Sequence, residues 1–253
     1  MHMHLSQMPG ESMNLERVKA IIFDFDGTLV NSAIDFESMK KEFFLALINR
    51  GIEPEILKIN DSLYENLIRV KSECRNSGKI SLLKELDQII EEVLLKAELQ
   101  NVENTTLING AKSVISLLRE RGYKIGLLTR GSRIYVMKAF DVVGLSTEEF
   151  DAIICRDDFS HDEAKPNGIA LTRIAARLGV DTSECVMIGD HPIDLYCAKE
   201  AKSNFIGVLS GKYDEEMWEA IGCNDIIGTV ADLPRVLWIL DGHSKNDRAE
   251  KFL

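Results

Sequence analysis

The chain has 253 residues, which is enough to bury a large core in one domain or in a domain with an insertion. Its residues are 45% hydrophobic and 28% charged, as in an ordinary globular protein, and no apolar run reaches the length of a membrane helix, about 18 residues. The formal net charge is −11 and no basic run is present, so we expect neither nucleic acid nor a membrane as a partner. The five cysteines form no C-x-x-C pair, which argues against a zinc site or disulfide framework and favours a cytoplasmic location.

The two ends of the chain lack the pattern of a folded element. Residues 1–13 contain no hydrophobic stretch and therefore do not resemble a signal peptide. Residues 241–253 are mostly polar. We expect both segments to be flexible ends of the folded protein.

Between these ends, short apolar runs alternate with segments of helical periodicity. The apolar runs lie at 18–25, 124–129, 150–155, 185–189 and 204–209. The helical segments lie at 111–121, 133–143, 169–178 and 193–202. This alternation predicts an α/β fold, a Rossmann-like parallel sheet with helices on both faces. Ligands of such sheets bind beyond the carboxyl ends of the strands.

Residues 31–104 interrupt the alternation between the first and second predicted strands. Apolar residues recur there at helical spacing, as in Phe36, Met39, Phe43, Phe44, Leu47 and Ile48, and again in Leu82, Leu83, Leu86, Ile89, Ile90, Val93 and Leu94. Gly51 and Pro54 separate the two groups. We predict an inserted all-helical cap at 31–104, and an α/β core made of residues 14–30 and 105–240.

The strongest local signal is the sequence DFDGTL at residues 24–29, directly after an apolar run. Alternate side chains of a strand share a face, so Asp24 and Asp26 can converge on one site. Two adjacent carboxylates repel unless a cation or a proton intervenes. This pairing permits one ionised nucleophile on a metal and one protonated acid, whereas a lone D-x-D pair is as often a polar turn. Gly27 allows a sharp exit from the strand.

Two further positions suit a phosphate group. Thr129 ends the second predicted strand and is followed by Arg130 and Gly131 at a helix start, where a hydroxyl and backbone N–H groups can hold phosphate oxygens. Lys165 precedes a later helix, and a lysine there can neutralise a phosphate and a carboxylate together. Without the other motifs, the simpler interpretation is that Thr129 only ends a strand and that Lys165 is an exposed surface charge.

A second group of aspartates follows the fourth predicted strand, in the sequence GDHPID at residues 189–194. Asp190 and Asp194 would supply hard oxygen ligands of the kind that Mg²⁺ prefers. Asp190 could also cap the following helix, with Pro192 in the first turn, and this role is compatible with metal binding.

In their order along the chain, these four segments resemble the four motifs of the haloacid-dehalogenase-like hydrolases. Residues 24–29 are similar to the first motif, Thr129 to the second, Lys165-Pro166 to the third, and residues 190–194 to the fourth. The resemblance extends over about 18–240. Similarity to the phosphoglycolate-phosphatase-like branch rests on Gly179-Val180, Glu184-Cys185 and Ile206-Gly207-Val208, and residues 31–104 occupy the place of that branch's helical cap.

The resemblance implies a magnesium-dependent hydrolase of small phosphate monoesters, phosphoglycolate among the candidates. It implies that Asp24 is the nucleophile that forms an aspartyl-phosphate, and that Asp26 protonates the leaving oxygen and then activates water. Mg²⁺ would be bound by Asp24, the Asp26 main-chain carbonyl and Asp190, with Asp194 a ligand or an orienting group. The phosphoryl group would be held by Thr129, Arg130, Gly131 and Lys165.

Two alternatives stay open at this point. A sugar phosphomutase uses the same groups but shields its aspartyl-phosphate from water, and a noncatalytic binding protein could retain the same fold. A dehalogenase is disfavoured because that activity lacks an acid at the position of Asp26. An ion-pumping ATPase is disfavoured because its first motif reads D-K-T-G-T. We expect a small phosphorylated metabolite as the partner of a monomer or homodimer.

Overall fold

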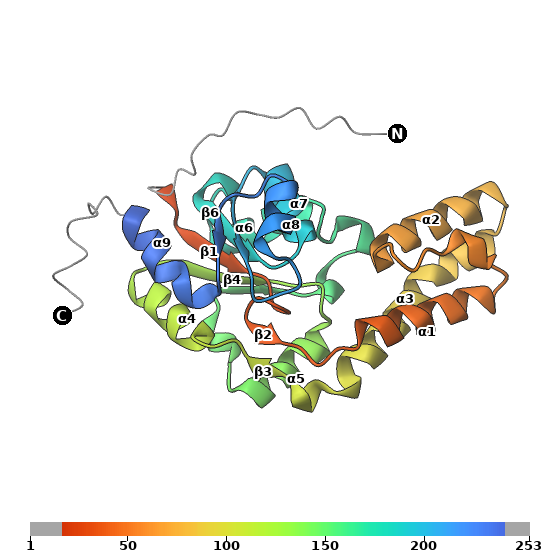
Figure 1. The fold of residues 1–253 in the computed structure, drawn as a ribbon, viewed down its shortest axis with the longest axis horizontal. Helices are drawn as coiled ribbons and strands as arrows, with labels where there is room; N and C mark the ends of the chain where they lie inside the picture. Colours follow the sequence, from red (N-terminus) through yellow and green to blue (C-terminus); the bar gives the residue numbers. More distant parts are fainter. Residues whose placement is uncertain (1–16, 241–253) are drawn as a thin grey trace.

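The computed structural model describes residues 17–240, and the flexible ends expected at 1–13 and 241–253 lie outside this range. Within it, a parallel six-stranded sheet has the strand order β5-β4-β1-β6-β7-β8 (Figure 1). The strands are β1 (Ala20–Phe23), β4 (Lys124–Leu128), β5 (Ala152–Ile154), β6 (Cys185–Gly189), β7 (Asn204–Val208) and β8 (Ile226–Ile227). The predicted α/β class with a parallel sheet is therefore confirmed.

The central position of β1 determines where the site lies. All four residues of β1 are buried, as expected for a parallel strand that is covered on both faces. The strand pairs in register with both β4 and β6, so that Phe23 lies beside Leu127 and Ile188. The residues that follow β1, β4 and β6 consequently emerge at the same edge of the sheet.

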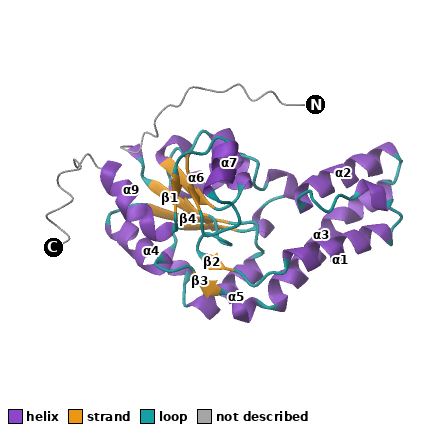
Figure 2. Ribbon diagram, in the orientation of Figure 1, coloured by secondary structure: helices purple, strands orange, loops and turns teal. Residues whose placement is uncertain are grey.

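Helices cover both faces of the sheet, as Figure 2 shows, and each face has its own hydrophobic core. Ile21 and Phe23 point to one face, whereas Ala20 and Ile22 point to the other. The first core includes residues of α4 (Ala111–Glu120), α5 (Arg133–Val143) and α9 (Leu233–Leu240). The second includes residues of α6 (Ile169–Leu178), α7 (Pro192–Ala201) and α8 (Glu215–Ala220).

Residues 31–104 contain three long helices: α1 (Phe36–Ile48), α2 (Leu63–Asn76) and α3 (Ile80–Gln100). They pack around a separate apolar cluster that includes Phe43, Leu47 and Leu86. Figure 1 shows these helices projecting to one side of the sheet. We refer to α1, α2 and α3 as the insertion helices.

The insertion is joined to the core by a short antiparallel pair, β2 (Val30–Asn31) and β3 (Thr106–Leu107). Short 3₁₀ turns occur at Pro54–Ile56, Val102–Asn104, Thr147–Glu149, Arg156–Asp158, His161–Glu163, Thr182–Glu184 and Val230–Asp232. Among the helices of residues 17–240, none has both the length and the apolar character needed to cross a bilayer. All five cysteines are buried and none forms a disulfide.

Candidate active site

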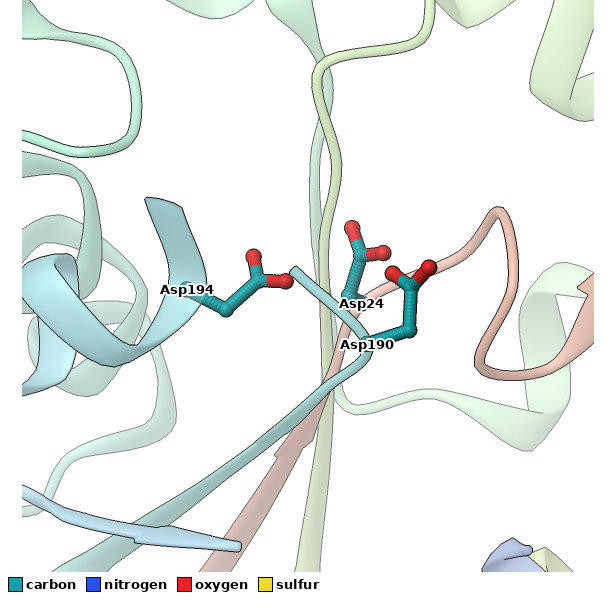
Figure 3. Close-up of side chains that lie close together, drawn as sticks. All are labelled: Asp24, Asp190 and Asp194. Carbon is teal, nitrogen blue, oxygen red and sulfur yellow. The ribbon is translucent and has the colours of Figure 1, made fainter. Parts of the chain in front are cut away.

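Three aspartates meet at the edge of the sheet where the strands end (Figure 3). Asp24 directly follows β1, Asp190 directly follows β6, and Asp194 lies in the first turn of α7. Each offers a carboxylate oxygen, and these oxygens all lie within 4.8 Å of one another. Asp24 and Asp194 are almost completely buried. The alignment of β1 with β6 thus gathers three charges from two distant parts of the chain.

Lys165 provides the positive charge of this cluster. Its side chain is 1% exposed, and Nζ lies 2.5 Å from Asp24 Oδ1 and 2.6 Å from Asp194 Oδ1. Burial opposes the ammonium charge, but attraction to Asp194 and Asp24 outweighs it and raises the pKa of Lys165. Asp194 Oδ2 also accepts a hydrogen bond of 3.2 Å from the backbone N–H of His191. Asp194 is therefore held in place on both of its oxygens.

Asp190 has a different environment from Asp194. Burial, together with repulsion from Asp24 and Asp194, raises the pKa of Asp190 to about 8. Two glycines border its carboxylate: a Cβ at Gly27 would lie 2.3 Å from Oδ2, and a Cβ at Gly211 would lie 2.0 Å from it. Gly27 has in addition a φ of +81°, which other residues rarely adopt. Side chains at either position would displace Asp190.

The three carboxylates outnumber the one ammonium group, so the cluster carries an excess of negative charge that a bound cation would offset. Carboxylate oxygens are the ligands that Mg²⁺ prefers, and the donor set of Asp24 and Asp190 fits that ion. Neither oxygen of Asp190 accepts a hydrogen bond from the described residues, whereas the Asp24 carboxylate accepts from Lys165 and from the backbone N–H of Phe25. Asp194 is also engaged, by Lys165 and His191.

Asp26 lies apart from the three clustered carboxylates. Its Oδ1 accepts a 2.6 Å hydrogen bond from the hydroxyl of Tyr135, which is on α5, and Ser32 also bonds to this carboxyl group. Burial raises the pKa of Asp26 to about 7, although the hydrogen bond from Tyr135 lowers it. An acid with such a pKa can carry a proton near neutral pH. Sequence reasoning missed Tyr135, because nothing in the sequence near it points to Asp26.

Thr129 and Gly131 form a tight turn after β4. The Thr129 N–H donates to Ile154 O at 3.0 Å, which continues the pairing of β4 with β5. Thr129 Oγ1 in turn accepts a 2.9 Å hydrogen bond from the Gly131 N–H. That amide, expected from the sequence to face a phosphate, is directed at Thr129 in this structure.

A buried ion-pair network supports the same turn and was also missed. Arg156 is 3% exposed and Glu98, on α3, is 5% exposed. The Arg156 guanidinium pairs with Glu98 and with Glu91, and it donates a 2.7 Å hydrogen bond to the carbonyl oxygen of Arg130. Glu98 Oε2 also accepts from the Ser132 hydroxyl at 2.7 Å. The network therefore connects an insertion helix to the turn that follows Thr129.

The side chain of Arg130 also lies between the core and the insertion. Its Nη1 donates a 3.1 Å hydrogen bond to the carbonyl oxygen of Lys165. Its guanidinium carbon lies 5.3 Å from the centroid of the Tyr64 ring, on α2. The structure thus brings Arg130 to the residue whose ammonium group contacts Asp24.

A family model of haloacid dehalogenase-like hydrolases matches residues 18–202, which is well over half of the chain. The chain belongs to this family. The resemblance seen in the sequence motifs is thereby confirmed, and it identifies the protein as a haloacid dehalogenase-like hydrolase.

Curated relatives of this hydrolase act on different substrates. The validoxylamine A 7'-phosphate phosphatase of Streptomyces hygroscopicus subsp. limoneus is 26% identical over 222 residues, covering 87% of this chain and 96% of the relative. The phosphoglycolate phosphatase of Colwellia psychrerythraea is 27% identical over 218 residues, covering 81% and 91%. A hydrolase of known structure from Pseudomonas syringae matches with a TM-score of 0.67 at 24% identity, covering 87% of this chain and 98% of that one. Its similarity shows the fold.

Proposed function

We propose that this protein is a magnesium-dependent phosphatase that hydrolyses small phosphate monoesters through an aspartyl-phosphate on Asp24. The observation that carries this proposal is the separation of two neighbouring carboxyl groups. Asp24 is held by Lys165 beside Asp190 and Asp194, whereas the half-buried Asp26 accepts a hydrogen bond from Tyr135 and has a pKa raised to about 7. This difference supports the roles of an ionised nucleophile for Asp24 and of a proton carrier for Asp26.

The proposed reaction has two halves. A carboxylate oxygen of Asp24 attacks phosphorus, the bond from phosphorus to the ester oxygen breaks, and the Asp26 carboxyl group gives its proton to the departing alcohol. In the second half, the Asp26 carboxylate takes a proton from a water molecule as that water attacks the same phosphorus. The bond between phosphorus and Asp24 then breaks, which releases inorganic phosphate and restores both groups.

The other residues of the site bind and neutralise charge. Thr129 and Lys165 would hold the phosphoryl oxygens, with Arg130 and the backbone near Gly131 beside them. The carboxylates of Asp24 and Asp190 and the main-chain carbonyl of Asp26 would hold Mg²⁺, with Asp194 fixing Lys165. When bound, the cation would reduce the repulsion between the substrate phosphate and the carboxylates around it.

Kinetics with an aryl phosphate test the proposed nucleophile. Asp24→Asn should lower kcat by more than about 10³-fold, since the amide keeps the shape of the side chain but cannot attack phosphorus. The exposed Asp141 on α5 provides the control, and Asp141→Asn should keep full activity. Appreciable turnover by purified Asp24→Asn would contradict the covalent mechanism.

Removal of the cation tests the metal site. We expect a chelator to abolish activity and Mg²⁺ to restore it, with Ca²⁺ a poor substitute because it favours more ligands and looser geometry. Asp190→Ala should raise the Mg²⁺ concentration needed for half-maximal activity by at least about tenfold. Full activity in the presence of chelator would contradict the proposed metal site.

The same assays separate the two alternatives. A phosphomutase would transfer the phosphoryl group between positions of a sugar phosphate and release little inorganic phosphate, and a binding protein would not turn over any ester. The cytoplasmic location stays a prediction, supported by the five buried cysteines without disulfides. The monomeric or dimeric state stays a prediction as well.

A further inference from the structure

Arg130 is a partly buried cation for which the described residues provide no anionic partner. Its contacts are the carbonyl oxygen of Lys165 and the ring of Tyr64. Within residues 17–240, no carboxylate oxygen lies within ion-pair distance of its guanidinium group. Arg156, in the turn that follows β5, differs in this respect because it pairs with Glu91 and Glu98.

Arg173 is a useful comparison, because its guanidinium group contacts both an aromatic ring and a carboxylate. Its guanidinium carbon lies 5.9 Å from the centroid of the Phe159 ring, and its Nη2 lies 2.6 Å from Glu163 Oε1. Arg130 has the aromatic contact but lacks the carboxylate. An arginine has several N–H donors arranged as a planar fork, and at Arg130 most of them remain available.

The surroundings of Arg130 are unfavourable for an uncompensated charge. Burial lowers the pKa of Arg130 and repulsion from Arg156 adds to this effect, whereas Tyr64 and the more distant charge of Asp194 oppose it only in part. A cation–π contact alone stabilises the charge less than its withdrawal from water destabilises it. An anion that binds beside Arg130 would therefore gain a strong partner.

Arg130 is also directed at the site rather than away from it. It follows Thr129, and its side chain reaches the backbone of Lys165, whose Nζ contacts Asp24. Tyr64 belongs to α2, so the guanidinium lies between the proposed phosphate site and the insertion helices. The part of a substrate that projects from the phosphate toward the insertion would meet Arg130.

We propose that Arg130 binds a second negatively charged group of the substrate, on the leaving-group side of the phosphate ester. This inference rests on the proposed phosphatase function and specifies its substrate class: small phosphate esters that also carry a carboxylate or a second phosphate. The planar fork of Arg130 suits both groups, because either can accept two parallel hydrogen bonds. The Tyr64 ring holds the guanidinium in position for this contact.

Matched substrates test the inference. The wild-type enzyme is assayed with phosphoglycolate, with ethylene glycol bisphosphate and with ethyl phosphate, which is neutral beyond its phosphate. We expect kcat/KM to be higher for at least one of the two anionic substrates than for ethyl phosphate, and the better one identifies the second group. Arg130→Met should lower kcat/KM for that substrate about 10- to 100-fold more than it lowers kcat/KM for ethyl phosphate. Arg130→Lys should fall between Arg130→Met and wild type, because it keeps the charge but loses the fork.

Arg173→Met is the matched control, since it removes an arginine with an aromatic contact that already has its own carboxylate. It should leave the ratio between anionic and neutral substrates unchanged. An equal loss for all three substrates in Arg130→Met and Arg130→Lys would show a structural role and overturn the inference. Wild-type preference for ethyl phosphate would overturn it as well.

The outcomes also separate this inference from the proposed function. If the wild-type enzyme hydrolyses aryl and ethyl phosphates in a reaction that Asp24→Asn abolishes, the proposed function holds. An absence of any preference for a second charge would then reject the role of Arg130 alone. If no ester is turned over, both proposals fail together.

Discussion

Asp24 and Asp26 are two residues apart and chemically identical, yet their surroundings give them different properties. Burial and repulsion from Asp194 raise the pKa of Asp24 to about 6, whereas contact with the Lys165 ammonium group lowers it and favours the charged form. Asp26 is half-buried beside the hydroxyl group of Tyr135, and its pKa rises to about 7. The different environments, rather than the residue type, support the assignment of separate roles.

The role of Asp26 predicts a dependence on the leaving group. Asp26→Asn should lower kcat strongly for an alkyl phosphate, whose leaving oxygen must be protonated as the bond breaks. For an aryl phosphate with a leaving group of low pKa, we expect a smaller loss in the first half-reaction. The measurement is a series of aryl and alkyl phosphates under single-turnover conditions. A uniform loss across the series would argue against a proton donor at this position.

The hydrogen bond from Tyr135 to Asp26 predicts that Tyr135 influences the reaction through Asp26, as a positioning residue. Tyr135→Phe removes the hydroxyl group and leaves the ring, which packs edge-on against Phe25. We expect kcat for an alkyl phosphate to fall about tenfold, because the Asp26 carboxyl group loses a hydrogen bond that orients it. KM should stay within about twofold, since no phosphate ligand is touched. A rise in KM at unchanged kcat would contradict a positioning role.

At the scale of secondary-structure elements, α3 is connected to the core by charge rather than by apolar packing alone. Glu98, near the end of α3, and Arg156, in a turn after β5, are both buried. Glu91, about two turns earlier on α3, pairs with the same guanidinium, but its side chain is 39% exposed. The two carboxylates therefore differ in how much water screens them.

This difference predicts unequal effects on stability. Glu98→Gln should lower the free energy of unfolding by about 3 kcal/mol, because it leaves a buried guanidinium short of a counter-charge. Glu91→Gln should cost about 1 kcal/mol or less, since water screens that pair. Denaturant unfolding of the two variants provides the measurement. Equal costs would show that burial of the pair is not the decisive factor.

At the scale of the whole molecule, the insertion helices project to one side of the sheet (Figure 1), and they contact residues that follow its strands. Two of these contacts join aromatic rings of the insertion to cations of the core: Tyr64 with Arg130, and Phe36 with Lys212 at 4.7 Å from the ring centroid. These contacts support the prediction that residues 31–104 act as a cap over Asp24. A closed cap would exclude bulk water and strengthen charge interactions in the site.

A cap also limits the size of the substrate. We expect kcat/KM to be higher for small monoesters than for phosphopeptides or phosphoproteins, because a chamber closed by the insertion helices has no space for a folded chain. The comparison is made with substrates that carry chemically similar phosphate esters, such as phosphoserine alone and within a peptide. Faster hydrolysis of the macromolecules would rule out a closed cap, and it would leave the assignments at Asp24 and Asp26 untouched.

Local sequence patterns were sufficient to predict the framework of the core. The expected helices at 133–143 and 169–178 and the expected strand at 185–189 coincide with α5, α6 and β6. Periodicity predicts such elements well because it reports which side chains of one short segment face the core. In contrast, β8 and α8 were not predicted, since each is too short to show a period.

What only the tertiary structure decided is which side chains meet. Lys165 contacts Asp24 across 141 residues of sequence, and Tyr135 contacts Asp26 across 109. The sequence motifs placed Asp24, Thr129, Lys165 and Asp190 at strand or helix ends, and a parallel sheet necessarily brings strand ends to one edge. The partners Tyr135, Arg156 and Tyr64 have no such motif, because an ordinary helix or turn residue acquires its role only when packing sets it beside a distant charge. The reacting groups of the proposed site could therefore be predicted from sequence motifs. The residues proposed to orient those groups and to select the substrate could be identified only from the tertiary structure.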